Sequence, residues 1–104
     1  MGDTNLISGI AKILETPKTK NLNLSIPTTQ FRVQFPQVRN TSVVYLTFWG
    51  NLASDVSNYY KINDYILIEG YISLRDRYNS NKIVSKSKKV EITVLKVYPF
   101  VLGY

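Results

Sequence analysis

The sequence predicts an all-β domain that carries one short helix, and three observations support this. Five segments show the apolar stretches or the apolar–polar alternation typical of β-strands. One segment between the third and the fourth has apolar residues at helical spacing. Pro and Asn turn signals separate these segments. The 104 residues fit a single domain, residues 1–104, with room for one hydrophobic core.

The first two predicted strands are Asn5–Leu14 and Thr28–Phe35. Gly9 inside the first strand predicts a bulge or a sharp bend, as the closure of a small barrel requires. The second strand alternates Phe and Val with polar residues and ends before a proline. We expect Glu15–Pro27 between them to be a turn or a long hairpin loop, because it contains Thr-Pro and Lys-Thr-Lys-Asn.

The third predicted strand, Ser42–Trp49, is apolar on one face and partly apolar on the other, so we expect the second face to be covered or functional. A helix over Asn51–Tyr60 follows, with an apolar stripe and with Asn51 or Ser54 as its N-cap. Asn63 favours a left-handed turn after the helix.

The fourth and fifth predicted strands are Tyr65–Arg77 and Lys86–Tyr98, joined by a turn around Asn79. Gly70 in the fourth strand removes a side chain where a barrel must bend. This order of elements is that of a five-stranded Greek-key OB-fold barrel with its helix between strands 3 and 4. Other small α+β folds use the same elements, so the order alone leaves them open.

The composition excludes several classes of function. The chain has no cysteine and no histidine, which excludes disulfides, thiolate chemistry and zinc sites with these ligands. Its seven acidic residues are scattered singly, so we expect no enzyme, no cofactor and no metal site. No apolar run approaches the roughly 18–20 residues of a membrane span. The net charge of +6 favours an anionic partner such as nucleic acid, an acidic protein or a membrane surface, or serves only solubility.

The segment Val44–Arg77 resembles the bacterial-type single-stranded DNA-binding proteins. It has an apolar strand that ends in aromatic-Gly, a Leu-Ala helix with Val and Tyr one and two turns on, the sequence Ile-Leu-Ile-Glu-Gly, and a strand with alternating basic residues. In size and composition the chain is most similar to the single-strand binders encoded in algal plastid genomes. The resemblance implies an OB fold, often an oligomer of identical chains, and single-stranded DNA as the partner, with RNA as the alternative.

The resemblance also implies a binding face on the middle strands and on the hairpin after the fourth strand. Trp49 matches the family's base-stacking aromatic residue, and Tyr45 and Thr47 share its side of the strand by period-two geometry. The alternative is that Trp49 packs in a core or in a subunit interface. Basic and aromatic residues supply the rest of the expected site, which consists of Arg32, Arg75, Arg77, Tyr78, Lys82 and Lys88. Two lysine clusters are weaker candidates for phosphate contacts: Lys86, Lys88 and Lys89, and Lys18 and Lys20.

The sequence departs from the family in ways that keep a second function open. Val43 stands where an aromatic residue is common, and the sequence ends in an apolar segment, Phe100–Tyr104, in place of an acidic tip. We therefore expect sequence-tolerant DNA binding in replication or maintenance, weaker and more dependent on charge than in the bacterial relatives. The alternative is an interaction or structural subunit of a larger complex. The abundance of Asn, Lys, Ile and Tyr indicates an AT-rich genome, and we expect a plastid protein made in the plastid, or otherwise one of the bacterial cytoplasm.

Overall fold

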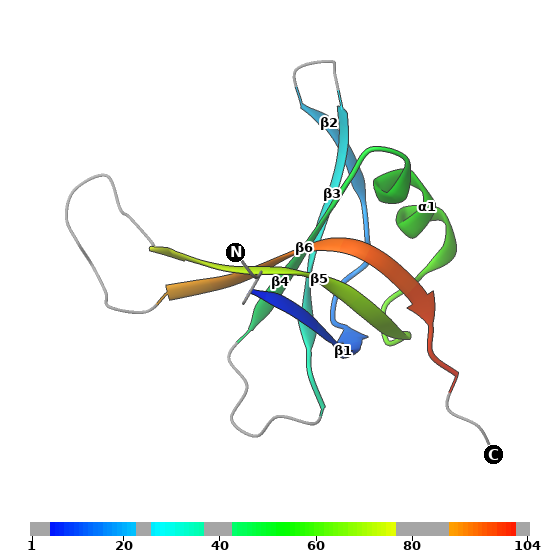
Figure 1. The fold of residues 1–104 in the computed structure, drawn as a ribbon. Helices are drawn as coiled ribbons and strands as arrows, with labels where there is room; N and C mark the ends of the chain where they lie inside the picture. Colours follow the sequence, from blue (N-terminus) through cyan, green and yellow to red (C-terminus); the bar gives the residue numbers. More distant parts are fainter. Residues whose placement is uncertain (1–4, 23–25, 37–42, 77–87, 102–104) are drawn as a thin grey trace.

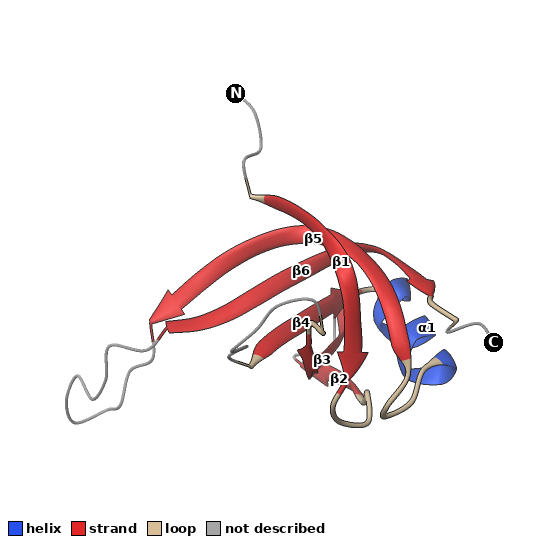
Figure 2. Cartoon of the chain, turned by 90° about the horizontal axis from the view of Figure 1, so that it is seen from below, coloured by secondary structure: helices blue, strands red, loops and turns tan. Residues whose placement is uncertain are grey.

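The computed structural model of the chain describes residues 5–22, 26–36, 43–76 and 88–101. Six strands form one strongly curved sheet, and a helix lies at one end of it (Figures 1 and 2). In chain order the elements are β1 (Leu6–Ile13), β2 (Thr19–Leu22), β3 (Ile26–Gln34), β4 (Val44–Trp49), α1 (Asn51–Tyr59), β5 (Tyr65–Asp76) and β6 (Lys88–Pro99). Among the described residues, no helix combines the length and the apolar character that a membrane span needs.

The sheet closes on itself in the order β1-β5-β6-β4-β3-β2, because β1 pairs with β5 and, at its end, also with β3. Lys12 and Ile13 make the closing pairs with β3. The pairing of β4 with β6 is parallel and all the others are antiparallel. The five predicted strands correspond to β1, β3, β4, β5 and β6, and the predicted helix lies between β4 and β5.

The sixth strand corrects the expectation that Glu15–Pro27 is only a turn or loop. Residues Thr19–Leu22 form β2, which pairs with β3 from Thr19↔Thr29 to Leu22↔Ile26. Its sequence, Thr-Lys-Asn-Leu, has no apolar alternation, so its position depends on tertiary contacts. One of these is the hydrogen bond between the hydroxyl groups of Thr19 and Ser57, 2.6 Å long, which ties β2 to α1.

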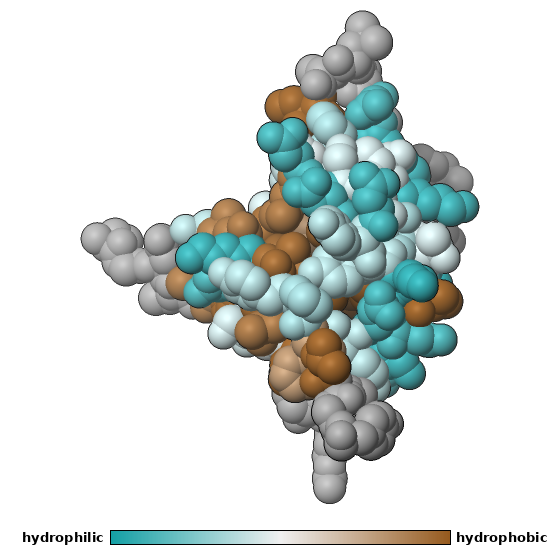
Figure 3. All heavy atoms as spheres, turned by 90° about the vertical axis from the view of Figure 1, so that its right-hand side faces the viewer, coloured by the Kyte–Doolittle hydropathy of each residue, from teal (hydrophilic) through white to brown (hydrophobic). Residues whose placement is uncertain are grey.

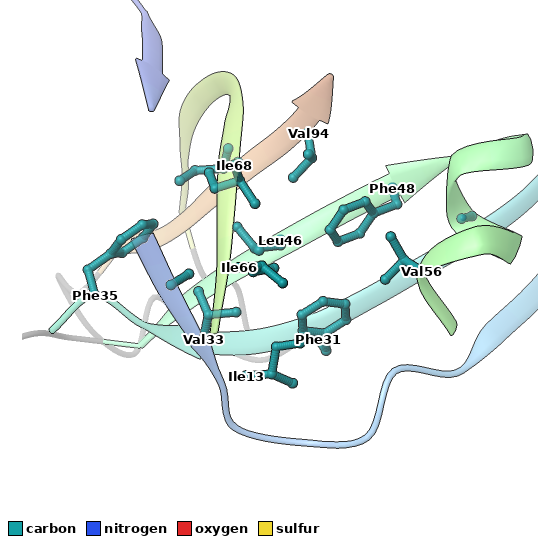
Figure 4. Close-up of a cluster of buried hydrophobic side chains, with 13 residues drawn as sticks. Ile13, Phe31, Val33, Phe35, Leu46, Phe48, Val56, Ile66, Ile68 and Val94 are labelled. Atoms are coloured by element: carbon teal, nitrogen blue, oxygen red, sulfur yellow. The ribbon is translucent and has the colours of Figure 1, made fainter. Parts of the chain in front are cut away.

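The inward faces of the strands enclose one hydrophobic core (Figure 4). The alternation read from β3 and β4 is confirmed, since Phe31, Val33, Leu46 and Phe48 are fully buried. The rings of Phe31 and Phe48 stack with centroids 5.3 Å apart. Val56 of α1 is buried beside them and closes one end of the core. The core therefore fixes which side chains of β3 and β4 point outward.

A β-bulge lies at a different place from the predicted one. Gly9 pairs with Ile68 in unbroken register, so the bulge expected at Gly9 is wrong. The register shifts instead between β5 and β6, where Glu69 pairs with Lys96 but Gly70 pairs with Val94. The extra residue on β6 is therefore Leu95, and a bulge at this point bends and twists the strand pair.

Gly70 lies at the closest approach of β5 and β6. A Cβ atom at this position would overlap the carbonyl oxygen of Thr93. The backbones approach this closely only because residue 70 has no side chain, which agrees with the bend expected there.

The turns around α1 confirm one expectation and correct another. The helix has Gly50 as its N-cap, with φ of 69° and no side-chain cap, so neither Asn51 nor Ser54 caps it. A left-handed φ favours glycine, and this allows β4 to turn directly into α1. Asn63 has the expected left-handed conformation, with φ of 76°.

We predict that Gly70→Ala lowers the free energy of unfolding by about 1–3 kcal/mol, because overpacking forces the two strand backbones apart. Urea denaturation followed by circular dichroism measures the change. Ser8→Ala is the control, since Ser8 is exposed on the neighbouring strand β1. Equal stability of Gly70→Ala and the native chain would contradict the close approach.

Candidate nucleic-acid interface

One face of the sheet, here called the outer face, is built by side chains that point away from the core on β3, β4, β6 and β5. Strand register sets its rows. Trp49 lies opposite Thr28, which in turn lies opposite Lys20 of β2. The next row joins Gln30, Thr47, Thr93 and Tyr71, and the third joins Arg32, Tyr45, Glu91 and Ser73. Neighbouring strands are about 4.8 Å apart, so each row spans roughly 10–15 Å.

Trp49 is the most prominent aromatic residue of this face. It is the last residue of β4 and is 52% exposed. Phe48 before it is buried in the core, so strand alternation directs Trp49 outward. Tyr45 lies on the same face and is half-buried. The sequence alternative that Trp49 packs in the core is therefore wrong.

Arg32 lies on the outer face opposite Tyr45, but its charge is engaged by a neighbour. The Arg32 Nε atom is 3.2 Å from Glu15 Oε1, and both side chains are partly exposed. The backbone N–H of Arg32 also donates to Glu15 Oε2 at 2.8 Å. Such an exposed ion pair contributes little stability and can open to a phosphate.

A hydrogen-bonded network occupies the centre of the outer face. Thr47 is 3% exposed and Glu91 is 6% exposed. The Thr47 hydroxyl donates to Glu91 Oε2 at 2.7 Å, and Gln30 Nε2 donates to the same oxygen at 3.3 Å. Gln30 Nε2 also lies 3.0 Å from Thr47 Oγ1. Thr47 thus lies on the expected face, but its hydroxyl holds Glu91 in place.

Basic residues meet at the far end of the β5–β6 hairpin. Arg75 pairs with Lys89, and Asp76 pairs with Lys88, so the register places three basic residues and one acid at neighbouring positions of the two strands. Lys18 and Lys20, in the second lysine cluster, are both exposed. Four further expected site residues, Arg77, Tyr78, Lys82 and Lys86, lie outside the described residues.

Sequence reasoning missed three residues of the outer face. Tyr71 is 39% exposed and Gln30 is exposed. Alternation along their strands already placed both outward, so this signal was present. Glu91 was not foreseen as a buried residue, because alternation separates two faces but does not tell which outward residues their neighbours cover. Among the described residues, no group of three or more Asp, Glu, His or Cys side chains is placed to hold a metal ion.

Comparison with known proteins gives a relative in sequence. No family model matches the chain. A protein of the alga Trieres chinensis, named "Putative single-stranded DNA-binding protein ycf41", is 40% identical over 102 residues, which cover 94% of this chain and 90% of the relative.

Solved structures give the fold. The SSB domain of a Synechococcus protein has a TM-score of 0.71 and 23% identity, and covers 94% of this chain and 98% of its own. The small single-stranded DNA-binding protein of Streptomyces coelicolor has a TM-score of 0.74 and 14% identity, with 97% and 96% covered. The second single-stranded DNA-binding protein of Mycobacterium smegmatis has a TM-score of 0.69 and 21% identity, with 91% and 87% covered. These likenesses confirm the predicted OB-fold class.

Proposed function

The chain belongs to the same family as the Trieres chinensis protein named "Putative single-stranded DNA-binding protein ycf41", and we propose that it binds single-stranded DNA without strong sequence preference. The observation that carries the proposed mechanism is the exposure of Trp49 on a sheet face that also presents Lys20 and Arg32. An aromatic ring stacks on any base, because every base has a π-face. The role is binding in DNA replication or maintenance, not catalysis, and the plastid is the proposed compartment.

The proposed path of the strand follows from the charges on the outer face. The centre of this face is the hydrogen-bonded network of Thr47, Gln30 and Glu91, none of which is a basic side chain that could bind a phosphate. Bases, which are uncharged, tolerate this centre and stack on Trp49, Tyr45 and Tyr71. Phosphates then run along the rim, towards Lys20, Arg32 and the paired Arg75 and Lys89. Arg77, Tyr78, Lys82 and Lys88 extend this rim in the proposal.

We further propose that the chain forms an oligomer with copies of itself through the outward side of β1, β5 and β6. Leu67 pairs with Ile10 of β1 and with Tyr98 of β6, and Leu67 and Tyr98 are 37% and 51% exposed. Apolar side chains that adjoin across strands form a contiguous patch, which is typical of a protein–protein contact. A second copy of this chain presents the same patch, so it is the partner we propose.

We predict that Trp49→Ala weakens the binding of a labelled poly-dT oligonucleotide by about 1–3 kcal/mol, because one stacking platform is lost. Fluorescence anisotropy measures this affinity without relying on the tryptophan signal. Trp49→Phe should retain most of the affinity. Tyr59→Ala is the control, since Tyr59 is an even more accessible ring, 77% exposed, at the end of α1. Unchanged affinity of Trp49→Ala would remove Trp49 from the site.

We predict that the affinity for poly-dT falls steeply with salt, because cations of the protein displace counterions from the strand. If the basic residues of the proposed path all contact phosphates, the slope of log K against log salt is about −5, or about −0.7 for each of seven contacts. These residues are Lys20, Arg32, Arg75, Arg77, Lys82, Lys88 and Lys89. Titrations at several NaCl concentrations give this slope. A flat salt dependence, at an affinity that can be measured, would contradict a binding mode built on charge.

We predict that the native chain sediments at a multiple of its 11.9 kDa mass, and that Leu67→Lys shifts it towards the monomer by placing a charge in the apolar contact. Sedimentation equilibrium measures both masses. Ile62→Lys is the control, because Ile62 is 47% exposed but lies in the turn after α1. A native chain that remains monomeric at high concentration would refute the oligomer.

A further inference from the structure

A cavity of about 490 Å³ lies away from the outer face, between the end of α1, the start of β5 and the end of β6. Its lining is Tyr59, Tyr60, Asp64, Tyr65 and Pro99–Val101. Figure 3 views the molecule from the side on which α1 and the end of β6 lie, where apolar patches interrupt a hydrophilic surface. Among the described residues, four aromatic rings and one carboxylate thus line the hollow, and none of its lining residues is basic.

Local backbone contacts hold this lining in place. The Asp64 Oδ2 atom accepts the backbone N–H of Lys61 at 2.9 Å, and the Asp64 N–H donates to the carbonyl of Lys61 at 3.1 Å. The backbone N–H of Phe100 donates to the carbonyl of Tyr65 at 3.0 Å. The cavity is therefore anchored by the α1–β5 turn on one side and by a strand-like contact on the other.

The electrostatic character of the cavity is negative. The pKa of Tyr60 is raised above its usual value of 10.0. The main cause is burial, followed by the Asp64 carboxylate and then by the neighbouring Tyr59. The cavity also adjoins the C-terminal end of α1, where the helix dipole places partial negative charge. The last turn of α1 has no basic residue, and the exposed Lys61 that follows the helix is not part of the cavity lining.

One ring of the cavity, that of Tyr65, has a cation near it. The ammonium group of Lys12 lies 6.0 Å from the centroid of the Tyr65 ring, at the outer limit of a cation–π contact. Lys12 does not line the cavity itself. The rings of Tyr59 and Tyr60, with centroids 6.3 Å apart and planes inclined by 50°, present further faces and edges.

We propose that this cavity is a docking site for an arginine or lysine side chain of a partner protein. A cationic head suits the carboxylate of Asp64 and the ring faces, and its aliphatic stem suits Pro99 and Val101. A nucleotide does not fit this chemistry, because its phosphate would meet Asp64 and the end of the helix dipole. The site therefore serves a protein partner and is separate from the proposed DNA face.

The site is tested on the full ¹⁵N-labelled chain by titration with N-acetyl-arginine N-methylamide and, as a neutral probe of the same shape, its citrulline analogue. The arginine probe should shift amide signals of residues 59–65 and 99–101 and bind about five- to tenfold more tightly than the citrulline probe. Equal binding of the two probes, or no shift at these residues, would overturn the proposal.

Two variants separate the charge from the shape of the cavity. Asp64→Asn keeps an acceptor for the Lys61 N–H but removes the charge, so the preference for arginine should fall to within about twofold. Asp55→Asn is the matched control, because Asp55 is an exposed acid on α1 outside the cavity, and it should keep the full preference. Loss of the arginine preference in both variants would mean that it depends only on the net charge of the protein, and this would overturn the proposed site.

Two further measurements keep this proposal distinct from the proposed function. Tyr59→Leu removes a ring that is 77% exposed without opening the core, and it should weaken the arginine probe while the spectrum stays folded. A dT oligonucleotide should leave the cavity signals unmoved, and shifts there would overturn the proposal by making the cavity part of the DNA site. Failure of the oligonucleotide to bind anywhere would refute the proposed function alone.

Discussion

The close approach of β5 and β6 at Gly70 and Thr93 is the constraint on which the rest of the fold depends. With Leu95 as the extra residue, β6 directs Ile92 and Val94 into the core before the bulge and Val97 towards it afterwards. The extra residue reverses the alternation, so that even-numbered residues point inward before it and odd-numbered residues after it. One long strand can therefore follow a strongly curved sheet while its apolar side stays inward. Because the bulge comes after Thr93, the outward direction of Glu91 and Thr93 stays in step with β4, and the outer face remains continuous across the parallel β4–β6 pair.

The outer face combines features that ordinarily oppose one another. Removing a carboxylate from water is costly unless hydrogen bonds replace its hydration, and Thr47 and Gln30 supply two of them to Glu91. The same bonds join three neighbouring strands, β3, β4 and β6, and so hold them in a fixed register. A rigid polar floor of this kind keeps Trp49 and Tyr45 at a set spacing. In the proposed function, this spacing lets successive bases meet ring faces without the protein having to reorganise.

The sequence was informative wherever burial on one face imposed a period, and much less so elsewhere. Alternation identified Phe31, Val33, Leu46 and Phe48 as core residues, and by elimination it directed Trp49 outward. It missed β2, because a short polar strand such as Thr19–Leu22 is stabilised by contacts with β3 and with α1. The residues that make these contacts are distant from β2 in the sequence. It placed a bulge or a sharp bend at Gly9, although the bulged residue is Leu95, since a bulge needs room for one extra residue and not a particular composition. The burial of Glu91 and Thr47 depends on their cross-strand neighbours, which a single sequence does not reveal.

The β5–β6 hairpin separates two kinds of surface chemistry. At one end Arg75, Lys88 and Lys89 come together, and at the other Tyr65 and Pro99 border the cavity that contains Asp64. The strand from Tyr65 to Arg75 has a contour length of roughly 33 Å. The curvature of the sheet makes the direct distance shorter, but it still exceeds the Debye length of about 8 Å at physiological salt. The negative cavity therefore does not weaken the attraction of a DNA strand to the basic end. The positive end likewise does not repel a basic side chain from the cavity. A chain with a net charge of +6 can thus offer a site for an anion and a site for a cation at once, and the stiffness of the paired strands keeps the two apart.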